Sequence, residues 1–174
     1  NAPFDGGATQ MAGDQTAAIT AGDSRAPASY LDGFLYTSGT WTTAPAMNTS
    51  APGGIRSQCG ILGTSQSSAI FAGGNPGTSP PGIANVEEWN GSVWTEIADI
   101  NTARADMGGA GSVTDGLVFG GFNPPTSFLG NTELWNGSSW SEQTDLNTGR
   151  TNGSGNRGTG SATWAAGGSE SAPV

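Results

Sequence analysis

The stretch Glu87–Trp94, EEWNGSVW, returns 46 positions later as Glu133–Trp140, ELWNGSSW. Both copies place a tryptophan on each side of Asn-Gly-Ser. Asn-Gly is the strongest short signal for a tight β-hairpin, because glycine adopts a positive φ freely and asparagine does so better than most residues. The repeated stretch therefore predicts two β-hairpins. In the first of them, Asn90 and Gly91 are expected to form a two-residue type I′ turn.

Such a turn determines which residues of the hairpin face each other. Trp89 would face Ser92 and Glu87 would face Trp94. Because side chains alternate along a strand, Trp89 and Trp94 then lie on one face as diagonal neighbours. The same reasoning holds for Trp135 and Trp140 in the second copy. We expect each hairpin to present a pair of indoles that packs on the adjacent unit.

The hairpins belong to a longer repeat. Four short runs end in a glycine pair or a near relative of one: Thr16–Asp23, Ser68–Asn75, Gly116–Asn123 and Ala162–Ser169. The pairs of successive runs stand 52, 47 and 47 positions apart. Each of the first three is followed by a variable loop, an aromatic hairpin and an Asn-Thr connector. Short runs bounded by turn residues are typical of strands, and no apolar stripe of helical period is long enough for a helix. The sequence predicts an all-β chain.

A repeat of about 50 residues with four strands is typical of a β-propeller blade. The glycine pair after the second strand, followed by aromatic residues in the third and fourth, resembles kelch repeats and the propeller of the galactose-oxidase family. The motifs that carry this resemblance are Gly73-Gly74 with Trp89 and Trp94, and Gly120-Gly121 with Trp135 and Trp140. Gly167-Gly168 begins the same pattern, whereas the first unit departs from it, with Ala21-Gly22 and Tyr36.

The resemblance implies a kelch-like β-propeller with about three and a half four-stranded blades in one segment, 1–174. The expected blades are 1–47, 48–100 and 101–146, followed by a half-blade, 147–174. A sheet that stops after its second strand leaves an unpaired edge, which favours association. We expect the missing strands to come from further chain or from a neighbouring subunit, and a longer chain is the favoured source.

Composition excludes several classes of protein. Fourteen acidic residues face five arginines, with no lysine and no histidine. The arginines stand singly, which argues against nucleic-acid binding and against docking on an anionic membrane. No apolar run approaches the length of a membrane-spanning helix. With 30 glycines and 10 prolines the chain approaches a disordered composition, but its six tryptophans and six phenylalanines recur in register and favour folded structure.

The chemistry needed for an enzyme is missing from the sequence. The galactose-oxidase resemblance would imply a copper site with histidine ligands and a tyrosine–cysteine crosslink, but the chain has no histidine, and its tyrosines are Tyr30 and Tyr36. Without histidine there is no Ser-His-Asp triad, and the single Cys59, expected to be a small buried residue, leaves no zinc site. We predict no catalytic residue, cofactor or metal. A pair of carboxylates acting on a glycoside stays open as an alternative, although no pair stands out among fourteen.

Two further patterns have a structural and a functional interpretation. Four asparagines begin acceptor triplets for N-glycosylation: Asn48, Asn90, Asn136 and Asn152. The hairpin turns already account for two of these, Asn90 and Asn136. The turn is the favoured interpretation. Arg104 and Arg150 stand at matching places in the connectors, as Glu87 and Glu133 do in the hairpins. We expect an ion pair between units, or arginine bound to loop carbonyls, rather than a ligand site.

The function follows from a second resemblance. The stretches NTELWNGSSWSE, DLNTGR and LVFGG are similar to kelch-like repeats in structural proteins of marine bacteriophages, such as tail fibres and head appendages. This resemblance implies a non-enzymatic structural or adhesive protein on a virion or another extracellular assembly. Its partners would be subunits of the same assembly and a host surface glycan, bound through the variable loops. The alternatives are a kelch module that binds a protein partner and a propeller enzyme that acts on polysaccharide.

Overall fold

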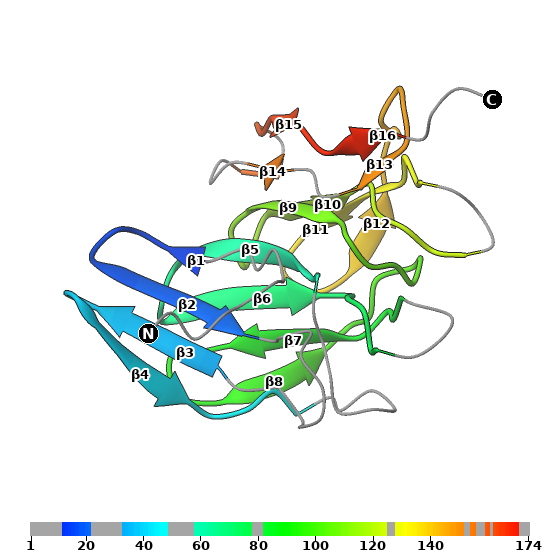
Figure 1. Ribbon diagram of the computed structural model, residues 1–174. Coiled ribbons are helices and arrows are strands. Elements are labelled where there is room, and N and C mark those ends of the chain that lie inside the picture. Colours follow the sequence, from blue (N-terminus) through cyan, green and yellow to red (C-terminus); the bar gives the residue numbers. More distant parts are fainter. Residues whose placement is uncertain are drawn as a thin grey trace.

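The computed structural model describes residues 12–21, 33–48, 58–77, 82–124, 128–151, 154–155, 159–160 and 162–170. Every helix or strand found in these ranges is a β-strand, as predicted (Figure 1). The same ranges contain no helix able to cross a membrane. The predicted residues Arg25, Arg56, Arg157, Tyr30 and Asn152 lie outside the described ranges.

Within the described residues, three antiparallel sheets of four strands follow one another along the chain, and in each sheet the strands pair in sequence order. The first consists of β1 (Ala12–Gly13), β2 (Ala17–Ala21), β3 (Gly33–Thr37) and β4 (Thr40–Ala44). The second consists of β5 (Gly60–Ser65), β6 (Ser68–Ala72), β7 (Val86–Trp89) and β8 (Trp94–Ile97). The third consists of β9 (Gly108–Gly111), β10 (Gly116–Phe119), β11 (Thr132–Trp135) and β12 (Trp140–Glu142). The predicted four-stranded unit is confirmed.

A fourth unit is shorter. β13 (Arg150–Thr151) pairs with β16 (Ser169–Glu170), and β14 (Ser154–Gly155) pairs with β15 (Ala165–Ala166). Both ladders keep the same antiparallel register, so they lie along one two-stranded ribbon. This ribbon corresponds to β9 and β10, where the bridge Ala105↔Phe122 continues the ladder in the same way. The fourth unit thus contains the equivalents of the first two strands of a sheet.

The sheets meet at their first strands, because β5 packs against both β1 and β9, and β9 also packs against β14. The approach of β9 to β5 is close. A Cβ atom added to Gly109 would stand 2.5 Å from the backbone nitrogen of Ile61. Glycine is therefore required at this position for the two sheets to pack, since any side chain would displace the neighbouring backbone.

In the part of the chain that the structure describes, two hydrophobic cores lie between successive sheets. The first joins Ile19, Ala44 and Met47 to the face of the second sheet that carries Phe71, Trp89 and Trp94. The second core joins the second sheet and the connector that follows it to Val118 and the other indole pair, Trp135 and Trp140. The residues on the side of the second sheet and its connector are Leu62, Ile70, Val86 and Ile100. Each indole pair thus packs on the preceding sheet. The prediction that the indoles pack on an adjacent unit is confirmed.

The predicted register of the Asn-Gly hairpins is wrong. Trp89 pairs directly with Trp94, and their ring centroids lie 5.2 Å apart. The loop has four residues, 90–93, and Gly91 (φ +98°) has a positive φ whereas Asn90 does not. Instead, Asn90 Oδ1 accepts hydrogen bonds from the N–H groups of Ser92 and Val93. This side-chain cap stabilises a wider loop and so competes with the two-residue turn.

The second hairpin has the same geometry, with Trp135 paired directly to Trp140 and centroids 5.1 Å apart. A two-residue turn with positive φ at both positions occurs in the first sheet instead, at Ser38 (φ +45°) and Gly39 (φ +95°). The indoles of each Asn-Gly hairpin still share one face, as predicted, but they face each other directly rather than diagonally.

Candidate functional site at the junctions between units

The candidate site is the junction between one unit and the next. We define a connector as the five residues that begin with the apolar residue before an Asn-Thr pair and that follow the last strand of a sheet. The connectors are 47–51, 100–104 and 146–150. A junction is a connector together with the groups of the next unit that bind it.

The second junction is built around Glu133, on the third strand of the third sheet. Its Oε2 accepts a hydrogen bond of 2.6 Å from the Asn101 N–H, and its Oε1 accepts one of 3.2 Å from the Thr102 N–H. Arg104 Nη1 lies 2.9 Å from Oε1, and both side chains are fully buried. A buried carboxylate is tolerated only when its oxygens are paired, and here both are.

The second tryptophan of the hairpin completes this junction. Its indole N–H, Trp140 Nε1, donates to the carbonyl of Ala98 over 2.9 Å. In return, Asn101 Nδ2 donates to the Trp140 carbonyl over 3.4 Å. The third sheet is therefore joined to the preceding connector by a carboxylate and by an indole.

The first junction uses the same groups. The Asn48 N–H donates to Glu87 Oε2 over 2.6 Å, and Asn48 Nδ2 donates to the Trp94 carbonyl over 2.7 Å. Trp94 Nε1 donates to the carbonyl of Pro45 over 2.8 Å. Both acceptor carbonyls, Pro45 and Ala98, stand three residues before the connector asparagine. The repeated Glu, Trp and Asn of the sequence thus form one repeated joint.

The glycine pairs hold the backbone of each connector arginine. The Gly74 N–H donates to the Arg104 carbonyl over 3.0 Å, and the Gly121 N–H donates to the Arg150 carbonyl over 2.8 Å. A Cβ atom on Gly73 would lie 2.6 Å from the Arg104 carbonyl oxygen, and Gly73 also has a positive φ of +59°. The glycine pair is thus explained by both a close approach and a left-handed backbone.

Arg104 and Glu133 form an ion pair, as predicted, but both lie within the predicted unit 101–146, so the pair does not join two units. Burial lowers the pKa of Arg104, and the negative charge of Glu133 opposes this shift. Within the described structure, Arg104 Nε and Nη2 have no hydrogen-bond partner, and Nη1 contacts Glu133 through the ion pair without a well-aligned hydrogen bond. A single close carboxylate therefore balances the buried guanidinium, so the loss of Glu133 would leave an unpaired buried charge.

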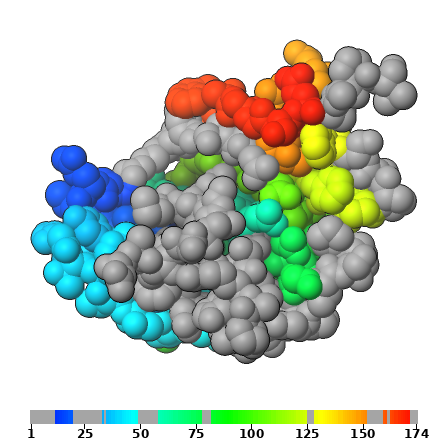
Figure 2. Space-filling view, in the orientation of Figure 1, coloured from blue at the N-terminus to red at the C-terminus, as the bar shows by residue number. Residues whose placement is uncertain are grey.

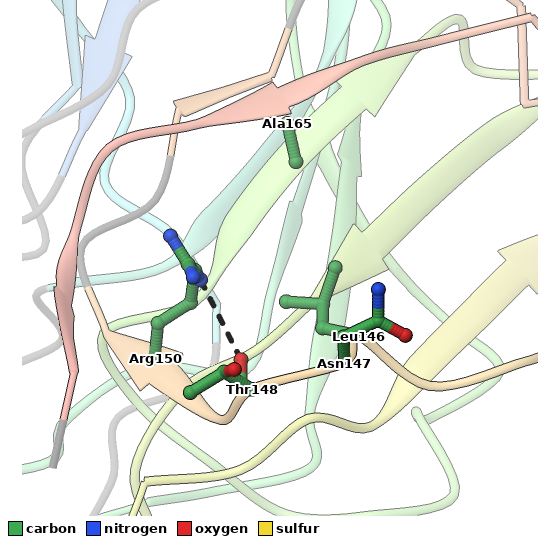
Figure 3. Close-up of a pocket in the computed structure, with 5 residues that line it drawn as sticks. All are labelled: Leu146, Asn147, Thr148, Arg150 and Ala165. Carbon is green, nitrogen blue, oxygen red and sulfur yellow. Dashed lines mark hydrogen bonds between the residues drawn. The ribbon is translucent and has the colours of Figure 1, made fainter.

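The third connector differs from the other two. Its arginine, Arg150, donates from Nη1 to the Gly167 carbonyl over 3.0 Å and forms an ion pair with Glu170. The prediction that a connector arginine binds a loop carbonyl is confirmed here. The guanidinium lies beside a cavity of about 250 Å³, shown in Figure 3, that is lined by Leu146, Asn147, Thr148, Arg150 and Ala165.

The remaining predicted residues lie on the surface or in the core. Asn48, Asn90 and Asn136 are exposed, and the side chains of Asn90 and Asn136 cap their own loops. Glycosylation of these residues stays a prediction. Cys59 is buried, as predicted. The Asn-Thr connectors were predicted from the sequence, but no role was predicted for Asn101. An asparagine stands three residues before both Arg104 and Arg150, and this recurrence was the available signal.

The acidic groups of the described residues form no cluster of three or more that could hold a metal ion. Partial desolvation and, to a smaller extent, the neighbouring Glu133 raise the pKa of the largely exposed Glu142, which pairs with Glu133 across the hairpin. Burial also raises the pKa of Asp106. No protein-family model matches this chain, and a search of the curated proteins found no relative.

Proposed function

We propose that this chain forms part of a kelch-like β-propeller that serves as a non-enzymatic structural and adhesive protein of an extracellular assembly, such as a virion. The four-stranded antiparallel sheets, which meet at their first strands, support the propeller assignment. The resemblance of the repeated stretches to phage structural proteins supports the location.

The observation that carries this proposal is that the repeated polar residues are buried and bind connector groups rather than facing an open site. Glu87, Glu133 and Arg104 are fully buried. The two glutamates bind connector backbone, and Arg104 pairs with Glu133. The residues that recur in register therefore join sheets, while the loops after the glycine pairs differ in sequence. Variable loops on a rigid repeated scaffold are suited to binding a partner surface.

The experiment is a glycan-array and cell-binding assay with the purified full chain. Two variants replace residues 77–81 and 124–127, which lie within the loops 75–85 and 122–131, by Gly-Ser segments of equal length. A control variant carries Val93→Thr in an exposed hairpin loop. We expect the wild type and the control to bind a surface glycan, and at least one loop variant to lose binding without a change in melting temperature.

Each outcome has a defined meaning. If no glycan or cell-surface preparation binds, the adhesive role is wrong. If the bound glycan is recovered in shortened form, the chain is an enzyme that acts on polysaccharide. If binding is indifferent to both loops, the contact surface lies elsewhere and the loop assignment is wrong.

A further inference from the structure

The two Asn-Gly hairpins carry the same exposed tripeptide. Asn90-Gly91-Ser92 and Asn136-Gly137-Ser138 are identical in sequence, and all of these residues are exposed to solvent. Their glycines have nearly the same positive φ, +98° and +93°. The two loops differ at their fourth residue, which is Val93 in the first hairpin and Ser139 in the second. The structure thus presents one dipeptide, Asn-Gly, twice in slightly different surroundings.

An asparagine followed by glycine can lose its side-chain amide. The backbone nitrogen of the glycine attacks Cγ of the asparagine, because glycine has no side chain to keep the two atoms apart. A bond forms between this nitrogen and Cγ, the nitrogen gives its proton to hydroxide, and the bond from Cγ to Nδ2 breaks. Nδ2 takes a proton from water and leaves as ammonia. Water then opens the five-membered ring at either carbonyl, which yields an aspartate or an isoaspartate whose main chain runs through Cβ.

In the first loop the amide of the asparagine is held by its own loop. Asn90 Oδ1 accepts hydrogen bonds from the N–H groups of Ser92 and Val93 over 3.1 and 3.0 Å, and from the Ser92 hydroxyl over 3.0 Å. For Cγ to turn onto the Gly91 nitrogen and close the ring, the side chain must leave these donors. The reaction therefore requires the loop to open locally, and its rate follows the population of the open loop.

The second loop holds its asparagine by one more group. Asn136 Oδ1 accepts hydrogen bonds from the N–H groups of Ser138 and Ser139 over 3.0 and 2.9 Å, and from the Ser138 hydroxyl over 2.9 Å. In addition, Asn136 Nδ2, the nitrogen that leaves as ammonia, donates to the Ser139 hydroxyl over 3.2 Å. The same hydroxyl donates to Oδ1 over 3.4 Å. Val93 has no hydroxyl at the matching place, so the first loop lacks this restraint.

We propose that Asn90 and Asn136 are deamidation sites controlled by the caps of their own loops, and that Asn90 is the more reactive of the two. The dipeptide and the serine after it are the same in both loops, so the fourth residue decides the order of the two rates. One hydrogen bond changes the equilibrium of loop opening by roughly two- to tenfold. Asn90 should react faster than Asn136 by a factor in this range.

The two products of the reaction act differently on the hairpin. An aspartate keeps a side-chain oxygen that accepts the same loop N–H groups. An isoaspartate lengthens the main chain inside the loop that closes the Trp89–Trp94 pair. The Trp94 carbonyl accepts a hydrogen bond from Asn48 Nδ2, and the Trp94 indole donates to the Pro45 carbonyl. An isoaspartate in this loop should therefore loosen the first junction, whereas Asn90→Asp should leave it intact.

Both hairpins belong to inner units of the described structure. The second and third sheets lie between the first sheet and the fourth unit, as the colours from blue to red in Figure 2 show. Trp140 of the second hairpin binds the Ala98 carbonyl as Trp94 binds that of Pro45. Modification of either loop thus acts on a joint between two sheets.

The test is site-resolved peptide mass spectrometry on the full chain, incubated at mildly alkaline pH and sampled over time, with aspartyl and isoaspartyl peptides separated. The references are free peptides that copy residues 86–97 and 132–143, because an isolated hairpin is at best marginally stable in water. We expect both sites to react at least roughly tenfold more slowly in the chain than in the peptides, since several hydrogen bonds must open. Asn101, which is exposed and followed by threonine, is the internal control and should stay unmodified over the same period.

Two substitutions exchange the surroundings of the loops. Val93→Ser supplies the missing hydroxyl and should slow the reaction at Asn90 by roughly two- to tenfold, and Ser139→Val should accelerate Asn136 by a similar factor. Neither substitution should change the rate in the free peptides. Both positions are exposed, so the melting temperatures of the variants should stay close to that of the wild type. The separated isoaspartyl form of the chain should melt at a lower temperature than Asn90→Asp.

The proposal is supported by slower reaction in the chain than in the peptides, by the predicted order of the two sites and by its reversal through the exchange. Equal rates in chain and peptides would overturn it, because the caps would then have no control over the reaction. Equal rates at the two sites, or no response to the exchange, would show that the serine hydroxyl has no part in it. If both peptides react and neither site of the chain does, these loops do not open in the folded protein and are not its modification sites.

Discussion

The buried carboxylate of the second junction allows a quantitative prediction. Glu133→Ala removes the acceptor of two backbone N–H groups and the close counterion of Arg104. Removing one partner of a buried ion pair costs about 3–5 kcal/mol, because the remaining charge stays buried without compensation. A domain of ordinary stability has roughly 5–15 kcal/mol in total. The substitution should therefore lower the melting temperature by roughly 6–20 °C, at about 2–4 °C per kcal/mol for this chain length.

The assay is urea unfolding followed by tryptophan fluorescence, supported by calorimetry. Glu142→Ala is the matched control, because Glu142 pairs with Glu133 across the hairpin but is exposed. A surface change of this kind should stay within about 0.5 kcal/mol of wild type. Arg104→Ala should also destabilise, since it leaves the Glu133 carboxylate buried without its cation. The double variant Arg104→Met with Glu133→Leu should recover much of the loss, because neither charge is then buried.

Three results would refute this reasoning. If Glu133→Ala were no more destabilising than Glu142→Ala, the junction would not depend on its carboxylate. If Arg104→Ala left the melting temperature unchanged, the ion pair would have no structural role. Strict additivity of the two charge removals would show that the two side chains are not coupled.

Four further substitutions test the hairpins and the contact between sheets. Trp140→Phe removes the donor to the Ala98 carbonyl and should cost about 1–3 kcal/mol in urea unfolding; a loss near zero would mean that water replaces the indole. Gly109→Ala forces a methyl group against the Ile61 backbone and should destabilise by more than about 1 kcal/mol in calorimetry, whereas a neutral result would mean that β5 and β9 separate easily. Asn90→Ala removes the side-chain cap of its loop and should cost about 1 kcal/mol, measured by thermal unfolding; an equally stable variant would mean that the cap does not stabilise the loop. The raised pKa of Glu142 means that the folded state binds its proton more tightly than the unfolded state does, so ionisation costs stability as pH rises through that pKa. Glu142→Gln should thus stabilise at pH 7 by at most about 0.5 kcal/mol, because the side chain is exposed, and the gain should vanish near pH 3; a gain independent of pH would contradict this cause.

The features predicted correctly from the sequence depend on local patterns. Short apolar runs between glycine pairs and polar loops specify strands, and recurrence in register specifies units of four strands. Trp89 and Trp94 lie on one face whether the loop has two or four residues. The two loop lengths differ by an even number of residues, and side chains along a strand alternate with a period of two. The register itself was predicted wrongly, since Asn90 can cap a wide loop with its side chain or occupy a tight turn with its backbone.

Thus the sequence by itself determined the all-β class, the repeat, the shared face of the indoles and the pairing of arginines with carboxylates or carbonyls. Tertiary structure decided which groups meet across the junctions. Asn101 and Glu133 are 32 residues apart, and their hydrogen bond forms only when one sheet packs on the next. Arg104 and Arg150 stand in similar local sequences, NTAR and NTGR, yet one is buried against a glutamate and the other lies beside an open cavity. That difference arises from the neighbouring strands, because a side chain's partner is set by what packs against it rather than by its own segment.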